Sequence, residues 1–67
     1  MDWNRVEGNW KQFKGAAKQK WGKLTDDDLT ASAGKREQIA GLLQQRYGYA
    51  KAQVEKELAA FSNALKP

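Results

Sequence analysis

The sequence has no cysteine and no histidine among its 67 residues. The lack of cysteine excludes disulfide bonds and thiolate metal sites, and it is typical of proteins from a reducing compartment. Histidine and cysteine are also the commonest general base and a strong nucleophile of enzymes. We therefore expect no enzyme activity, no catalytic residues, no cofactor, no metal and no small-molecule substrate.

Long apolar stretches are missing as well. No uninterrupted apolar run approaches the ~20 residues that a membrane-spanning helix needs. The first residues, Met1 to Arg5, lack the apolar core of a secretory signal. We expect a single domain over residues 1–67, with no membrane span and a cytoplasmic location.

Charge is unevenly distributed along the chain. Twelve Lys and Arg residues against eight Asp and Glu residues give a net charge of +4. Residues 1–24 carry +4, residues 25–34 carry −3, and the remainder carries +3. This distribution permits anionic partners without requiring them. The mean hydropathy of −0.88 is low, but an apolar content of 40% with three tryptophans predicts a folded chain.

The glycines that are present follow a regular spacing. All six lie seven residues apart in two runs, and the second run is displaced from the first by 26 positions: Gly8, Gly15 and Gly22, then Gly34, Gly41 and Gly48. The same displacement relates Phe13 to Ile39 and Trp21 to Tyr47. Such self-similarity predicts an approximate internal duplication of a helical unit.

Apolar residues recur at intervals of three and four, and no segment alternates with a period of two. This periodicity predicts amphipathic helices and no strand. We expect an all-α fold, a small bundle of four helices, over about residues 10–21, 26–31, 35–47 and 50–64.

Several residues mark the ends of these helices. Thr25 and Asp28 have the spacing of a capping box, so Asp26, Asp27 and Asp28 are interpreted as a helix start rather than a calcium loop. Gly22 and Gly48 are expected in the left-handed position that ends a helix. Residues 32–34 are expected to form a break.

Gly15 and Gly41 fall within predicted helices, on the side away from the main apolar stripe. Each costs about 1 kcal/mol relative to alanine in a helix interior. Three interpretations are open: a tolerated surface residue, a second face that another helix or a partner approaches closely, and a deliberately weakened helix.

The strongest candidate site is a basic stretch interleaved with Trp10, Phe13 and Trp21. Aromatic residues beside cations are typical of proteins that bind single-stranded nucleic acids. The alternative is that the aromatics form the core stripe and the lysines its solvated flank. The candidate anion or partner face consists of Lys11, Lys14, Lys18, Lys20 and Lys23.

Four segments carry a family resemblance: Gly8-Asn9-Trp10-Lys11-Gln12-Phe13-Lys14-Gly15, Trp21-Gly22-Lys23-Leu24-Thr25-Asp26-Asp27-Asp28-Leu29, Gly34-Lys35-Arg36-Glu37-Gln38 and Gln45-Arg46-Tyr47-Gly48-Tyr49. In order and spacing they resemble the bacterial CsbD-like family of small general-stress proteins. The resemblance implies two helical hairpins packed crosswise, similar to a sterile alpha motif, and production under stress in a bacterial cytoplasm. It implies no substrate, ligand or functional residue.

The expected function is therefore that of a non-enzymatic general stress response protein, acting as a hydrophilic protectant or a weak interaction module. One alternative is a nucleic-acid or polyanion binding module that uses the basic face from Lys11 to Lys23. Another is a protein–protein adaptor, by analogy with the expected fold. The sequence does not identify a partner, beyond weak contacts with nucleic acid or protein.

Overall fold

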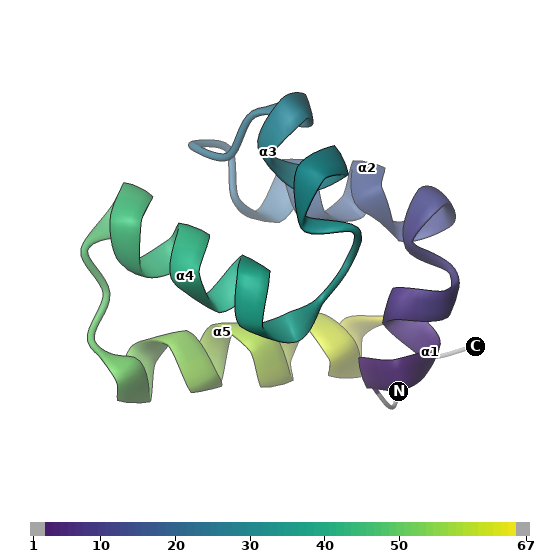
Figure 1. Ribbon diagram of the computed structural model, residues 1–67. Coiled ribbons are helices and arrows are strands. Elements are labelled where there is room, and N and C mark those ends of the chain that lie inside the picture. Colours follow the sequence, from purple (N-terminus) through teal and green to yellow (C-terminus); the bar gives the residue numbers. More distant parts are fainter. Residues whose placement is uncertain (1–2, 66–67) are drawn as a thin grey trace.

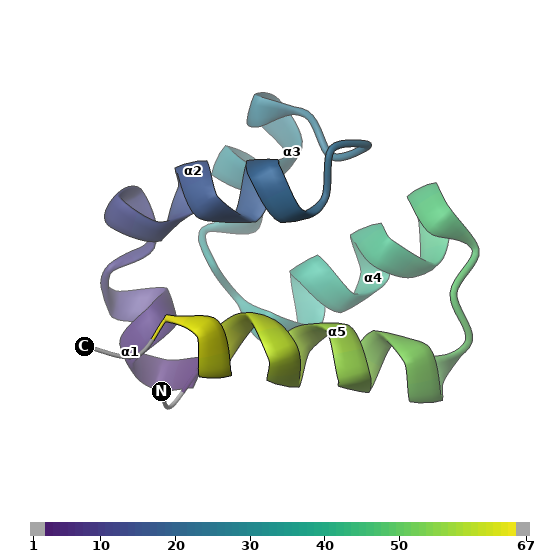
Figure 2. The ribbon, with the colours of Figure 1, turned by 180° about the vertical axis from the view of Figure 1, so that it is seen from behind.

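The computed structural model describes residues 3–65, and this part of the chain contains five helices and no strand. The α4–α5 hairpin forms one layer, and α2 and α3 lie over it (Figures 1 and 2). The prediction of an all-α fold is confirmed. The helices are α1 (Trp3–Gly8), α2 (Trp10–Lys20), α3 (Asp26–Ser32), α4 (Arg36–Tyr47) and α5 (Lys51–Ala64).

The expected number of helices was wrong, because α1 precedes the first predicted helix, which corresponds to α2. The chain turns at Asn9, whose backbone leaves the helical conformation at φ −117° and ψ 30°. The turn is held by the Asn9 N–H and side-chain amide, which both donate to the carbonyl of Arg5. It directs α1 towards the end of α5 (Figure 2). There the rings of Trp3 and Phe61 lie 6.0 Å apart.

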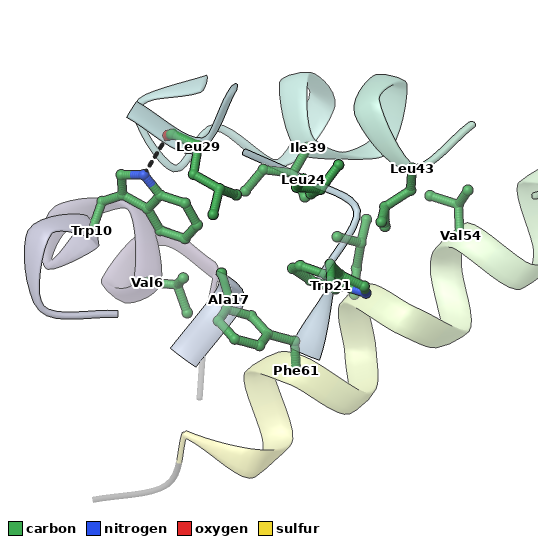
Figure 3. Close-up of a cluster of buried hydrophobic side chains, with 11 residues drawn as sticks. Val6, Trp10, Ala17, Trp21, Leu24, Leu29, Ile39, Leu43, Val54 and Phe61 are labelled. Carbon is green, nitrogen blue, oxygen red and sulfur yellow. Dashed lines mark hydrogen bonds between the residues drawn. The ribbon is translucent and has the colours of Figure 1, made fainter. Parts of the chain in front are cut away.

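Eleven apolar side chains from all five helices and the α2–α3 loop form one core (Figure 3). Burial of a large apolar side chain contributes about 1.5–3 kcal/mol, so this cluster is the main stabilising feature of a chain without disulfides. Around it, the half-buried residues include Phe13, Leu42 and Tyr47. The core residues are Val6, Trp10, Ala17, Trp21, Leu24, Leu29, Ile39, Leu43, Val54, Leu58 and Phe61.

The three tryptophans connect the N-terminal part of the chain to the rest through their indole N–H groups. Trp3 donates to the carbonyl of Gly34 at 2.9 Å, and Trp10 donates to that of Leu29 at 2.7 Å (Figure 3). Trp21 donates to the carboxylate of Glu57 at 3.0 Å. Each buried or half-buried indole thus satisfies its single donor and also fixes the position of one element against another.

The start of α3 is as predicted. Thr25 is the N-cap, its hydroxyl accepts from the backbone N–H of Asp28, and the Asp28 carboxylate accepts from the N–H of Thr25. The capping box is confirmed. The predicted break at residues 32–34 is also confirmed, because Ala33 and Gly34 both adopt left-handed conformations, with φ of 54° and 76°.

The ends of α2 and α4 differ. Gly48 ends α4 in the predicted left-handed conformation, with φ 70°. The same prediction for Gly22 was wrong, since the described glycines with positive φ are Gly34 and Gly48. α2 already ends at Lys20, and Trp21 leaves the helix with φ −117° and buries its indole in the core. The chain reverses through this buried residue and so does not need a left-handed glycine.

Within residues 3–65, four ion pairs connect α2, α3, α4 and α5 in a closed ring. Lysines of α2 pair with α3 (Lys14–Asp26) and with α5 (Lys20–Glu57). Arginines of α4 pair with α3 (Arg46–Asp28) and with α5 (Arg36–Glu55). In every pair the cation comes from α2 or α4 and the carboxylate from α3 or α5. Exposed pairs contribute about 0–1 kcal/mol each, so the ring supports the arrangement that the core establishes.

The helix boundaries agree with the 26-residue displacement of the sequence. α2 begins at Trp10 and α4 at Arg36, and their glycines, Gly15 and Gly41, occupy matching positions. The two segments nevertheless end differently, at Gly22 and Gly48, and the internal duplication stays a prediction. The crosswise pairing of hairpins and the likeness to a sterile alpha motif stay predictions.

Candidate functional site

The five lysines of the candidate face do not form one uniform patch. Four of them lie on α2, and Lys23 lies in the loop between α2 and α3. The apolar side of α2 positions them, because Trp10 and Ala17 are buried and turn the opposite side of the helix to solvent. Three of the five lysines contact other parts of the chain.

Lys14 faces α3. Its Nζ donates to the hydroxyl of Thr30 at 2.9 Å and lies 3.6 Å from a carboxylate oxygen of Asp26. The Lys14 side chain is 28% exposed, slightly less than the 32% of Lys20, the other ion-paired lysine of α2. A ligand that contacted Lys14 would have to compete with Asp26.

Lys20 faces α5. Its Nζ lies 3.9 Å from the same Glu57 oxygen that accepts the indole N–H of Trp21. It also lies 6.0 Å from the centre of the Trp21 ring. Lys20 therefore partly balances a carboxylate that the fold uses to hold a buried tryptophan.

Lys23 contacts the end of α4. Its backbone N–H donates to the hydroxyl of Tyr47 at 3.1 Å, and its Nζ lies 5.2 Å above the centre of the Tyr47 ring. Tyr47 is in turn stacked on Tyr49, with ring centres 5.0 Å apart. Both tyrosines are half-buried against the core, which shows packing across a helix junction.

Lys11 and Lys18 differ from the other three lysines of the candidate face. Both are exposed, and neither makes an ion pair or a hydrogen bond within residues 3–65. Seven residues separate them, so they lie on the same side of α2 within about 20° of each other. Gly15 lies between them along the helix, and a Cβ atom placed there would have nothing within 4 Å.

The aromatic residues of the basic stretch belong to the core. Trp10 and Trp21 are 7% and 1% exposed, and Phe13 is half-buried. Their rings are therefore not free to stack on bases, as the single-stranded nucleic-acid interpretation required. The structure supports the alternative interpretation, in which these aromatics form the core stripe and the lysines flank it.

The acidic turn at Asp26, Asp27 and Asp28 has a structural role. The backbone N–H of Thr25 and the guanidinium of Arg46 lower the pKa of the Asp28 carboxyl below its ordinary value of 3.8. Within residues 3–65 no cluster of three or more His, Cys, Asp or Glu side chains is arranged to hold a metal ion. None of the described helices is both long enough and apolar enough to cross a membrane.

Two open grooves were not predicted from the sequence. One, of about 460 Å³, lies between α1 and the start of α4. The other, of about 510 Å³, lies between α4 and α5 and includes Gly41. Arg36 and Glu37 line both grooves, with charges of opposite sign. No motif marks either groove in the sequence, because each forms only when helices that are separate along the chain come together.

The comparisons with known proteins cover most of the chain. The profile of the CsbD-like family matches residues 4–56. A UPF0337 protein of Rhodopseudomonas palustris is 65% identical over 66 residues, which cover 98% of this chain and 100% of that protein. A UPF0337 protein of Pectobacterium atrosepticum and the UPF0337 protein YjbJ of Escherichia coli K12 are 60% and 59% identical, each over 87% of this chain and 84% of the relative. The expected resemblance is thus confirmed, and the chain belongs to the CsbD-like family.

Proposed function

We propose that the protein is a non-enzymatic stress-response protein that acts through its polar surface, as a hydrophilic protectant making weak contacts with other macromolecules. One observation carries this proposal: within residues 3–65, no large hydrophobic side chain is exposed. The surface consists of charged, amide and small side chains. Such a surface resists self-association at high protein concentration. It also offers hydration and weak polar contacts to the macromolecules around it.

The two glycines in helix interiors, Gly15 and Gly41, are compatible with the same proposal. They lie in the interiors of α2 and α4, where a Cβ atom would meet no neighbour within 4 Å. Packing therefore does not require glycine at either position, although each lowers stability by about 1 kcal/mol relative to alanine. A protectant needs solubility and abundance more than a rigid site, so this cost is compatible with its function.

The test is the residual activity of a labile enzyme after drying or heating, with this protein or an equal mass of an inert control protein. We expect greater residual activity with this protein. Protection equal to that of the control protein would overturn the proposal.

A pair of variants tests the role of the polar surface. Gln12 and Gln19 are exposed on the same side of α2. The double variant Gln12→Leu, Gln19→Leu creates an apolar patch and should protect less, because such patches promote association. The matched variant Gln12→Ala, Gln19→Ala removes the same amides without large apolar groups and should protect as well as the parent protein.

A second candidate function is a polyanion-binding module. It is favoured by the composition of α2, which has four lysines and no acidic residue. Lys11 and Lys18 are the two of these four that have no partner within the described chain.

A further inference from the structure

The exposed side of α2 carries Lys11 and Lys18, and this helix contains no acidic residue. Both side chains are exposed, and the neighbouring cation Lys14 is already balanced by Asp26. Of the three carboxylates at the start of α3, Asp28 is paired with Arg46. Asp27, the third carboxylate of that turn, makes no ion pair within the described residues.

The spacing of the two free lysines suits a nucleic-acid backbone. Seven residues along a helix correspond to about 10 Å. The grooves of duplex DNA are about 6 and 12 Å wide, so two lysines at this separation reach phosphates on both sides of a groove. At Gly15, between them, no side chain projects and a Cβ atom would meet nothing within 4 Å, which leaves room for a backbone to approach the helix.

The burial of the aromatic residues decides which nucleic acid fits. Trp10 and Trp21 are enclosed in the core and cannot offer a ring to an unpaired base. Binding of single strands depends strongly on such stacking, whereas binding to a duplex without sequence preference depends on phosphate contacts by lysine and arginine.

We propose that the exposed side of α2 is a docking surface for the phosphate backbone of duplex DNA, contacted through Lys11 and Lys18 without reading the bases. This inference rests on the second candidate function and names its partner and its residues. Two phosphate contacts imply weak binding with a modest dependence on salt. The logarithm of the association constant should fall with that of the salt concentration with a slope of about −2.

The experiment measures fluorescence anisotropy of a labelled duplex of mixed sequence, at salt concentrations between about 50 and 200 mM. In the variant Lys11→Gln, Lys18→Gln we expect a loss of affinity of about tenfold or more and a slope reduced by about 1 for each lysine. The matched variant Lys51→Gln, Lys56→Gln changes the net charge equally, on α5. It should bind within about threefold of the parent protein, since nonspecific attraction falls only modestly with net charge.

Two further probes separate this inference from the candidate function. Equal losses in the two double variants, or tighter binding of a single strand than of the duplex, would overturn the assignment to α2 and to duplex DNA. Binding of inorganic polyphosphate without binding of the duplex would overturn the inference and leave polyanion binding intact. Binding of neither probe would overturn both. Circular dichroism and urea unfolding of each variant establish that the fold is retained.

Discussion

The indole of Trp10 occupies the space that a side chain at position 34 would need. A Cβ atom on Gly34 would lie 2.8–2.9 Å from three atoms of Trp10, and the φ of Gly34 is +76°. Two features therefore select glycine at this position: the left-handed backbone favours it, and the close contact with Trp10 leaves no space for a Cβ atom. The contact holds α2 against the α3–α4 turn, next to the Trp10–Leu29 hydrogen bond.

Replacing Gly34 by alanine should be strongly destabilising. The left-handed conformation costs a residue with a Cβ about 1–2 kcal/mol, and displacement of the buried indole adds about 1–3 kcal/mol. Urea unfolding followed by circular dichroism measures the loss. Gly48→Ala is the matched control, because Gly48 has φ +70° but open space around its Cβ position. Equal losses in the two variants would show that the contact with Trp10 contributes nothing.

The glycines in the interiors of α2 and α4 should behave in the opposite way. Gly15→Ala and Gly41→Ala place a methyl group in open space within a helix. Each should raise the free energy of unfolding by about 1 kcal/mol, which corresponds to roughly 4–8 °C in Tm for a domain of this size. A gain in Tm with unchanged association, measured by sedimentation, identifies them as tolerated surface residues. A loss of association would instead show that these positions form a contact face.

The sequence predicts those features of the fold that depend on neighbouring residues. The capping box of Thr25 and Asp28 is local, and it was predicted correctly. α1 was missed, because the first predicted helix begins at about residue 10, after the turn at Asn9. Ala33, the residue that ends α3, adopts a left-handed conformation that the alanine itself does not indicate.

The candidate site shows the same limit. The sequence groups five lysines by their proximity along the chain. The structure connects Lys14, Lys20 and Lys23 to other elements, through Asp26, Glu57 and Tyr47 in turn. For Lys20 and Lys23 these partners lie more than twenty residues away, so local spacing contains no information about them. The two lysines that remain free could only be identified after the tertiary contacts were known.

Glu57 should contribute to stability mainly by accepting the indole N–H of Trp21. Glu57→Ala leaves a buried donor without its partner and should cost about 1–3 kcal/mol. Glu57→Gln keeps one oxygen acceptor for the indole and loses the partly exposed charge opposite Lys20 and the exposed acceptor of the Gln53 amide. Its cost should be about 1 kcal/mol or less. Urea unfolding of both variants gives the comparison. If glutamine were as damaging as alanine, the ion pair rather than the indole hydrogen bond would be the important contact.

The stability of the fold should depend on pH through Asp28. The pKa of its carboxyl is lower in the folded protein than its ordinary value of 3.8. The charged form therefore favours folding, its contribution is complete above that value, and it is lost as the pH falls through the lower folded-state pKa. The free energy of unfolding of Asp28→Asn should consequently fall less on acidification below pH 4 than that of the parent protein.

The control for this measurement is Asp27→Asn, which removes the same charge from the same turn of α3. Asp27 is exposed and makes no hydrogen bond or ion pair within residues 3–65. Its variant should keep the acid dependence of the parent protein. If the pH profile of Asp28→Asn ran parallel to that of the parent, the capping box and Arg46 would not be the source of acid sensitivity.

The start of α5 offers a stabilising substitution. Ala50 is its N-cap and has φ −71° and ψ 161°, close to the φ −83° and ψ 164° of Thr25 at the capped start of α3. Ala50 has no side chain that can accept a hydrogen bond, whereas Ala50→Ser together with the existing Gln53 gives the sequence pattern of a capping box. The free energy of unfolding should rise by about 0.5–2 kcal/mol.

The same substitution in the middle of α5 separates capping from any general effect of serine. Ala59 is exposed and lies inside the helix, so Ala59→Ser adds a hydroxyl without an unsatisfied N–H nearby. It should lower stability by about 0.5 kcal/mol, as helix propensity requires. Opposite signs for the two serines in urea unfolding establish that the start of α5 is uncapped. A loss at both positions would mean that water already satisfies the first N–H groups of α5 as well as a side chain can.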